Sequence, residues 1–263
     1  MSASSYAALC TDFYVNQKVA LRMDIPERRE TVLDMFDRIR RTLPFMEQFR
    51  RYEDELALES PEFDARYCWL ALRRTSIRSG WVNPDSLDEA YKLHRLILEV
   101  APYYLTISPL DVEYIELVFG FDLGSTVNCN EIIFDALYSD SPLAGLIDNH
   151  GETLLDVQPR IGLCLNDRCS RKAYIEIKSS PRSLFSPKSP VTGMETPAIG
   201  AFEPLPEPIS VYLTVRQDGP LDTTEDFNSV FGALAGYTER LAEERVIPQV
   251  IMPLRDTLLS HPG

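Results

Sequence analysis

Three arginines stand within six positions of one another in the stretch LALRRTSIRSGWVNP, residues 70–84. They are Arg73, Arg74 and Arg78, and Trp81 follows them. A guanidinium presents its N–H donors in a rigid fork that suits bidentate contact with a carboxylate or a phosphate. We therefore identify Arg73, Arg74, Arg78 and Trp81 as a candidate site for an anion or for a partner.

The alternation of side chains over residues 67–79 predicts one continuous strand. On such a strand Arg74 and Arg78 share one face, and Arg73 lies on the other. Three interpretations of the arginines remain open: neutralisation by acids of the second half of the chain such as Glu116, binding of an anionic ligand, or exposure to solvent. The first interpretation predicts that Arg74→Ala lowers thermal stability.

The charge is divided unevenly along the chain. The whole sequence has a net charge of −14, whereas residues 1–100 contain 15 Lys or Arg against 17 Asp or Glu. No Lys or Arg occurs between Arg95 and Arg160. An acidic protein lacks the cationic face that general nucleic-acid binding requires, so we expect no nucleic-acid partner. A local basic site remains compatible with this balance.

Few other residues have spacings that indicate chemistry. The sequence contains no GxSxG, GxxxxGK[ST], GxGxxG or HExxH motif. Of the three histidines, His94 lies among apolar residues of an expected helix and is interpreted as structural, and His150 and His261 have no ligand at metal-site spacing. The sequence therefore indicates no enzyme, cofactor or metal site.

The five cysteines are scattered, and the first residues lack the basic and apolar regions of a secretory signal. We expect reduced thiols, a cytoplasmic location and no membrane segment. Cys164 and Cys169 flank an expected hairpin turn. We interpret them as structural thiols, with a redox pair as the alternative.

Hydrophobic periodicity predicts alternating strands and helices in the first hundred residues. A half-buried strand at 15–24 precedes a helix that Asp24 and Glu27 are suited to cap and that ends near Pro44. Strands follow near 55–60 and 67–79, and Asp85 and Ser86 are suited to cap a helix over 87–100.

The second half repeats this order. At an offset of 98 residues Asp24, Phe36, Asp37 and Pro44 coincide with Asp122, Phe134, Asp135 and Pro142, and Val19 coincides with Leu117. We infer a duplication, with 1–101 as an arginine-rich repeat and 102–263 as an acidic one. The expected fold is α+β: two tandem βαββα-like repeats, mostly antiparallel sheets and helices packed on one face.

The second repeat is expected to contain further strands at 155–165, 173–178 and 209–216. A proline-rich loop at 179–208 separates the last two, and we interpret it as a mobile excursion, with a partner-binding polyproline segment as the alternative. Asp222 and Glu225 are suited to cap a final helix, which Pro248 and Pro253 are expected to break.

The phrases LALRRTSIRSGWVNP, SPLDVEYIELVFGFDLG and LDVQPRIG resemble a family of conserved bacterial proteins of no assigned activity. The resemblance implies no catalytic motif. We expect a non-catalytic cytoplasmic binding or assembly protein with a protein partner or self-association. The alternative is a binder of a small anion, or an enzyme acting on one, that uses Arg73, Arg74 and Arg78.

Overall fold

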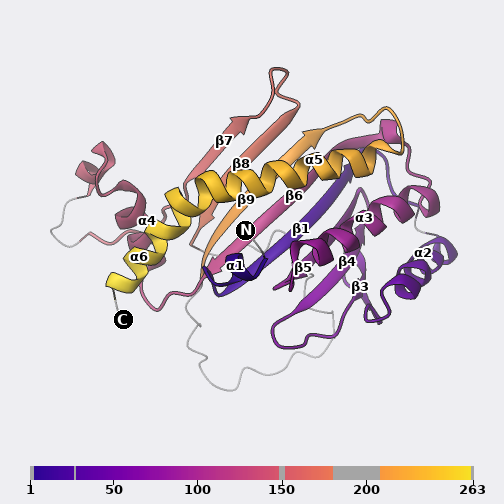
Figure 1. Ribbon diagram of the computed structural model, residues 1–263, viewed down its shortest axis with the longest axis horizontal. Coiled ribbons are helices and arrows are strands. Elements are labelled where there is room, and N and C mark those ends of the chain that lie inside the picture. The colour runs from indigo at the N-terminus through magenta and orange to yellow at the C-terminus, as the bar shows by residue number, and fades with distance from the viewer. Residues whose placement is uncertain (1–2, 27, 148–151, 180–207, 262–263) are drawn as a thin grey trace.

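A nine-stranded antiparallel sheet crosses the molecule (Figure 1). The computed structural model describes residues 3–26, 28–147, 152–179 and 208–261. The sheet together with the helices confirms the expected α+β class. In order across the sheet, the strands are β2 (Gln48–Arg51), β3 (Glu55–Glu59), β4 (Tyr67–Arg73), β5 (Ser76–Val82), β1 (Asp12–Leu21), β6 (Val112–Leu123), β9 (Ile209–Asp218), β8 (Arg171–Lys178) and β7 (Arg160–Cys164).

The two central strands, β1 and β6, show how the sequence builds the two faces of the sheet. Val15 and Val19 of β1 and Phe119 of β6 are buried in the main hydrophobic core. Lys18 and Glu116, which pair directly across β1 and β6, point to the opposite face because successive side chains alternate. We call the face that carries Lys18 and Glu116 the polar face.

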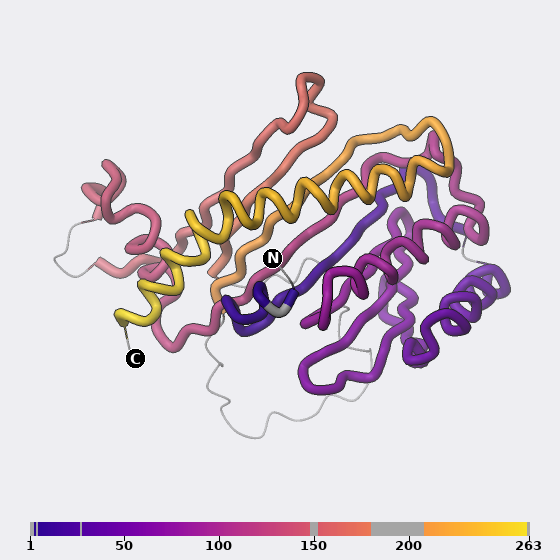
Figure 2. Tube along the Cα trace, viewed as in Figure 1, coloured from indigo at the N-terminus to yellow at the C-terminus, as the bar shows by residue number. Residues whose placement is uncertain are grey.

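Helices of residues 87–104 and 226–241 lie over the other face of the sheet (Figure 1). Figure 2 shows α3 (Leu87–Tyr104) and the long C-terminal rod, residues 226–260, running across the strands. Apolar side chains of β1, β6 and β9 belong to the same hydrophobic core as those of these helices. The helical elements are α1 (Ala3–Ala7), α2 (Arg29–Thr42), α3 (Leu87–Tyr104), η1 (Pro109–Asp111), α4 (Cys129–Tyr138), η2 (Pro142–Leu146), α5 (Asp226–Leu241), η3 (Ala242–Ile251) and α6 (Met252–Ser260).

The C-terminal rod corrects one expectation. Pro248 and Pro253 do not interrupt it, since α5, the π-helical η3 and α6 follow one another without a gap. Pro253 lies in the first turn of α6, where a missing N–H costs little, and the wider η3 accommodates Pro248. No helix of the described residues is long and apolar enough to cross a bilayer.

The region 67–79 is a hairpin rather than the single strand expected from its alternation. β4 ends at Arg73 and β5 begins at Ser76, so the chain turns at Arg74 and Thr75. The carbonyls of these two turn residues accept hydrogen bonds from the N–H groups of Ile25 and Leu21. The turn reverses the alternation, which places Arg73 and Arg78 on the same face.

The three expected helix caps have different outcomes, and at α5 Glu225 occupies the N-cap position without a side-chain hydrogen bond. Ser86 caps α3 by accepting a hydrogen bond from the N–H of Glu89, which confirms the expectation. α2 begins later than expected and has Arg28 at its N-cap without a side-chain hydrogen bond, so the role assigned to Asp24 was wrong. Asp24 pairs with Arg74 instead. The short edge strand β2 was not expected.

Two further expectations lie outside the described residues. The proline-rich loop falls almost entirely within residues 180–207, and His150 falls within 148–151.

Candidate functional site

A cavity of about 640 Å³ lies on the polar face of the sheet, where β1 meets β6. This volume is within the range of small-molecule sites, about 300–1,000 Å³. Its lining is unusually basic for a protein with a net charge of −14. The charged side chains that line this cavity, which we call the basic pocket, are Lys18, Arg73, Arg78, Arg160, Lys178, Arg216, Glu116 and Glu176.

Glu55 of β3 holds two of these cations. Its Oε2 accepts a hydrogen bond from Arg73 Nε at 2.6 Å and another from Arg78 Nη2 at 2.7 Å. Burial lowers the pKa of Arg78 and the Glu55 carboxylate opposes this shift, but an arginine stays charged in proteins. One carboxylate therefore serves two guanidinium groups, and these three described side chains together carry one net positive charge.

The second half of the chain contributes two similar arrangements. Arg216 of β9 donates to Glu116 Oε2 through Nε at 2.9 Å and Nη2 at 2.6 Å. Burial by itself would lower the pKa of Arg216, but the Glu116 carboxylate raises it above its ordinary value. Glu176 pairs with both Arg160 and Lys178, at 2.7 Å and 3.2 Å. This second shared carboxylate leaves another excess positive charge.

Lys18 differs from the other cations. Its Nζ donates to the hydroxyl oxygen of Tyr114 at 2.7 Å, and no carboxylate among the described residues pairs with it. The Tyr114 oxygen acts as acceptor in this bond, so its own hydrogen remains available to donate to a ligand. The described lining contains six cationic side chains and two carboxylates, and Glu55, which lies below Arg73 and Arg78, is a third carboxylate. Among the residues that the structure describes, the pocket therefore has three more positive charges than negative ones.

The acids of the basic pocket lie deeper than the cations that they hold. The side chains of Glu55, Glu116 and Glu176 are 2%, 4% and 16% exposed. Their partners Arg73, Arg216 and Arg160 are 36%, 29% and 65% exposed. In the surface pairs Arg40–Asp37 and Arg66–Asp85 the carboxylate is instead the more exposed partner. A molecule that enters the pocket thus meets positive charge first.

One side chain from each of five neighbouring strands forms a series along this pocket. Lys18 of β1 lies 5.1 Å from the centre of the Tyr114 ring of β6, near its hydroxyl, and Arg216 of β9 packs on that ring at 3.8 Å. Arg216 and Arg160 of β7 lie 5.7 Å and 5.2 Å from the ring of Tyr174 of β8. We call this series the cation–tyrosine ladder. Cation–π attraction helps to fix each guanidinium in place.

The structure separates the four residues identified from the sequence. Arg73 and Arg78 line the basic pocket. Arg74 lies in the hairpin turn, 77% exposed, and its Nε donates to Asp24 at 2.8 Å. Trp81 faces the helix side of the sheet and packs against Phe45. Neither Arg74 nor Trp81 lines the pocket, because the hairpin turn changes which side chains share a face.

The ion pairs that the structure describes for these arginines lie within the first half, and the expected pairing with acids of the second half stays a prediction. Arg73 and Arg78 pair with Glu55, and Arg74 with Asp24, all in the first half. Glu116 holds Arg216 instead.

Most residues of the site were not identified from the sequence, among them Lys18, Tyr114, Arg160, Tyr174, Lys178 and Arg216. Each occupies a position on a strand where a polar or aromatic residue alternates with apolar ones. That pattern marks a solvent-facing side of any strand, and it does not reveal which strands become neighbours.

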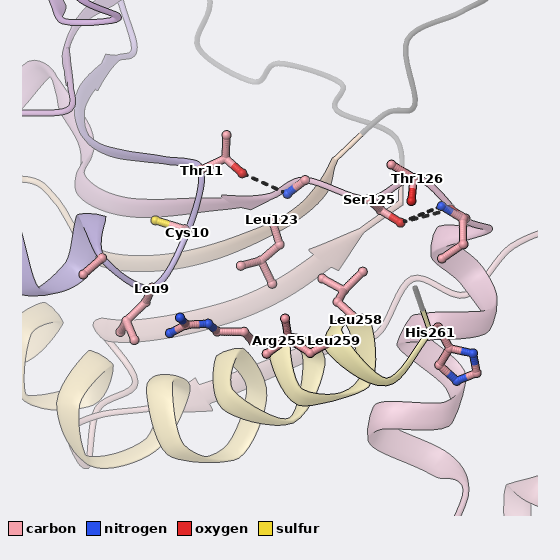
Figure 3. Close-up of a pocket in the computed structure, with 13 residues that line it drawn as sticks. Leu9, Cys10, Thr11, Leu123, Ser125, Thr126, Arg255, Leu258, Leu259 and His261 are labelled. Atoms are coloured by element: carbon pink, nitrogen blue, oxygen red, sulfur yellow. Dashed lines mark hydrogen bonds between the residues drawn. The ribbon is translucent and has the colours of Figure 1, made fainter. Parts of the chain in front are cut away.

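A second cavity, of about 350 Å³, lies between α6, the segment before β1 and the loop that follows β6 (Figure 3). Arg255, Leu258 and Leu259 line it from α6. Burial, followed by the nearby carboxylates of Asp122 and Asp12, raises the pKa of Cys10 to about 12. The Cys10 thiol is therefore protonated at neutral pH and is a poor nucleophile.

In the same cavity, Thr11 Oγ1 accepts a hydrogen bond from the N–H of Gly124 (Figure 3). Ser125 Oγ is bonded to the backbone of Val127. These hydroxyl groups are thus engaged in holding the loop. The basic pocket offers far more charge and is the stronger candidate site.

The described histidines each contact another side chain, and two of the cysteines are joined to each other. His94 is fully buried, with Nδ1 2.8 Å from Ser79 Oγ, in keeping with the structural role expected. His261 Nε2 lies 3.6 Å from Asp135. Cys164 and Cys169 are joined as a disulfide across the β7–β8 turn, which differs from the separate thiols expected. Within the described part of the chain no cluster of three metal-ligating side chains occurs.

Comparison with known proteins returns no match, either to a protein-family model or to a curated protein.

Proposed function

We propose that this chain is a binding protein that holds a multiply charged anion in the basic pocket. The observation that carries the proposal is the layering of charge, with carboxylates at the bottom and cations above them. Buried carboxylates fix the cations in position before a ligand arrives, which reduces the ordering cost of binding. The three excess positive charges then favour an anion that carries several negative charges.

Binding rather than catalysis is proposed because the side chains of the basic pocket are arranged to hold charge. Its cations contact carboxylates or a tyrosine hydroxyl at hydrogen-bond distance. Arginine keeps its proton throughout the physiological pH range, so it positions an anion rather than exchanging protons with it. This agrees with the non-catalytic role expected from the sequence.

We further propose that the two halves arose by duplication and that the basic pocket lies where they join. The order β3-β4-β5-β1 on one side of the centre is matched by β7-β8-β9-β6 on the other. Val19 and Leu117, equivalent at the offset of 98, are both buried on the helix-covered side of β1 and β6. The pairs Lys18–Arg78 and Glu116–Arg216 occupy corresponding ladder positions.

Calorimetric titration with inorganic triphosphate tests the proposed function. We expect binding to the wild type and at least about tenfold weaker binding to Lys18→Met, a loss of about 1.4 kcal/mol. Methionine keeps the length of the apolar stem, and removing Lys18 leaves no described carboxylate without its partner. Arg74→Gln makes the same change in charge outside the pocket and should bind as the wild type does. Absence of binding to the wild type would refute the proposal.

A further inference from the structure

The excess positive charges of the basic pocket are spread across the sheet rather than gathered at one point. One belongs to Arg73 and Arg78 above Glu55, one to Lys18, and one to the pair that shares Glu176. From β5 to β8 there are four strand intervals of about 4.8 Å, so this series extends for roughly 19 Å. A single compact anion cannot contact all of it at once.

The ladder sets the spacing that a ligand must match. Lys18, Arg216 and Arg160 stand on β1, β9 and β7, so consecutive cations are two strands apart, or about 10 Å. Acidic side chains on one face of an extended peptide recur about every 7 Å, and neighbours on a helix lie about 5–6 Å apart. Neither period matches the ladder. A polymer that carries a negative charge on every repeating unit can contact all the ladder cations whatever their spacing.

The tyrosines of the ladder argue against a ligand that is held by stacked bases. Arg216 covers one face of Tyr114, and Tyr174 lies between Arg216 and Arg160. Single-stranded nucleic acids are held largely by bases that stack on free aromatic faces. The rings here are engaged by guanidinium groups, which leaves little face for a base.

The sheet itself argues against a peptide added as a further strand. β1, β6, β9 and β8 are each paired with a neighbour on both sides. Strand addition requires an unpaired edge, such as the outer edge of β7, and Arg216 of β9 and Lys18 of β1 lie two and four strands away from β7. A ligand of the basic pocket must therefore be recognised through its charges.

From these observations we infer that the ligand is a linear condensed phosphate chain lying across the strands along the cation–tyrosine ladder. This inference rests on the proposed function and specifies its ligand. Phosphate oxygens accept from Lys18 Nζ, from the free hydrogen of the Tyr114 hydroxyl and from the outer N–H groups of Arg216. Arg160, the most exposed cation of the ladder, contacts the far end of the chain.

Affinity should consequently depend on the length of the phosphate chain. The test is calorimetric titration at 0.15 M salt with orthophosphate, pyrophosphate, triphosphate and a long polyphosphate. We expect affinity to rise at least about tenfold from orthophosphate to triphosphate and to rise again for the long chain. ATP should bind no more tightly than triphosphate, because its base finds no free ring. Orthophosphate binding as tightly as the long chain would overturn the inference and leave the proposed function standing.

Arg160→Gln and Arg74→Gln form a matched pair of variants for the same titrations. Both remove an exposed arginine, and Glu176 keeps Lys178 as its partner when Arg160 is replaced. Arg160→Gln should weaken long polyphosphate about tenfold and change orthophosphate binding by less than about twofold, since its charge lies about a Debye length from Arg216, the next cation of the ladder. Arg74→Gln should change neither.

Two other outcomes would overturn the inference. Equal effects of the two variants on polyphosphate would mean that Arg160 does not contact the chain. Tighter binding of a glutamate oligomer of matched charge than of triphosphate would identify an acidic peptide as the ligand. If no anion binds at all, the proposed function fails together with this inference.

Discussion

Glu55 and Arg78 form an ion pair that is almost completely withdrawn from solvent, with Oε2 2.7 Å from Nη2 and side-chain exposures of 2% and 3%. Arg73 donates to the same oxygen from the rim of the basic pocket. Because Glu55 is the shared partner, its charge determines the position of both arginines. Loss of this ion pair should therefore destabilise the first half of the sheet and also displace two arginines that line the pocket.

Replacement of Glu55 should therefore be costly. Glu55→Gln leaves the buried guanidinium of Arg78 beside a neutral amide, and breaking a buried pair typically costs about 3–5 kcal/mol. We expect urea unfolding to show a loss of this size. Asp24→Asn is the control, because its pair with Arg74 is exposed and such pairs are worth about 0–1 kcal/mol. Equal losses in the two variants would contradict the assigned role of Glu55.

His94 should make the folded state sensitive to acid. Burial lowers its pKa to about 3, with a backbone hydrogen bond at Val15 acting in the opposite direction. In the unfolded chain the imidazole of His94 becomes protonated below its ordinary pKa of about 6.5, whereas in the folded protein it stays neutral down to about pH 3. Between these two pH values His94 therefore lowers the free energy of unfolding by about 1.4 kcal/mol for each pH unit of acidification. Ser79 and Phe231, two side chains that His94 contacts, are uncharged.

The matching measurement is the free energy of unfolding between pH 7 and pH 4 for the wild type and for His94→Gln. Glutamine does not titrate, so the variant should show a shallower loss of stability with acid, whatever its stability at pH 7. Parallel profiles for the two proteins would show that His94 is not held neutral in the fold.

Gly120 should not tolerate a side chain. It pairs with Tyr14 across β1 and β6, and a Cβ at this position would overlap the Tyr14 ring. That ring is held by a hydrogen bond from its hydroxyl to Asp122 and by contact with Tyr212, so it cannot move aside freely. Gly120→Ala should cost about 1–3 kcal/mol by overpacking.

Thermal unfolding of Gly120→Ala beside Gly145→Ala checks this expectation. A Cβ at Gly145 would meet no atom within 4 Å, so that variant should unfold near the wild-type temperature. A wild-type melting temperature for Gly120→Ala would mean that Tyr14 does not cover the glycine.

The sequence alone determined the local features of this protein. Alternation in β1 separates Val15 and Val19 from Lys18, and each strand therefore has one face for the core and one for solvent. Ser86 marks the start of α3 because an N-cap is a local hydrogen bond between residues three positions apart. His94 was recognised as structural from its apolar neighbours in the helix.

The tertiary structure decided which of these local features come together. A two-residue turn at Arg74 moved Arg73 to the face of Arg78 and left Arg74 and Trp81 outside the pocket. The ladder joins side chains that are up to about two hundred positions apart, because β9 inserts between β6 and β8. Periodicity fixes the direction in which a side chain points but not the strand beside it. The basic pocket exists only once long-range strand pairing has placed cations of both halves side by side.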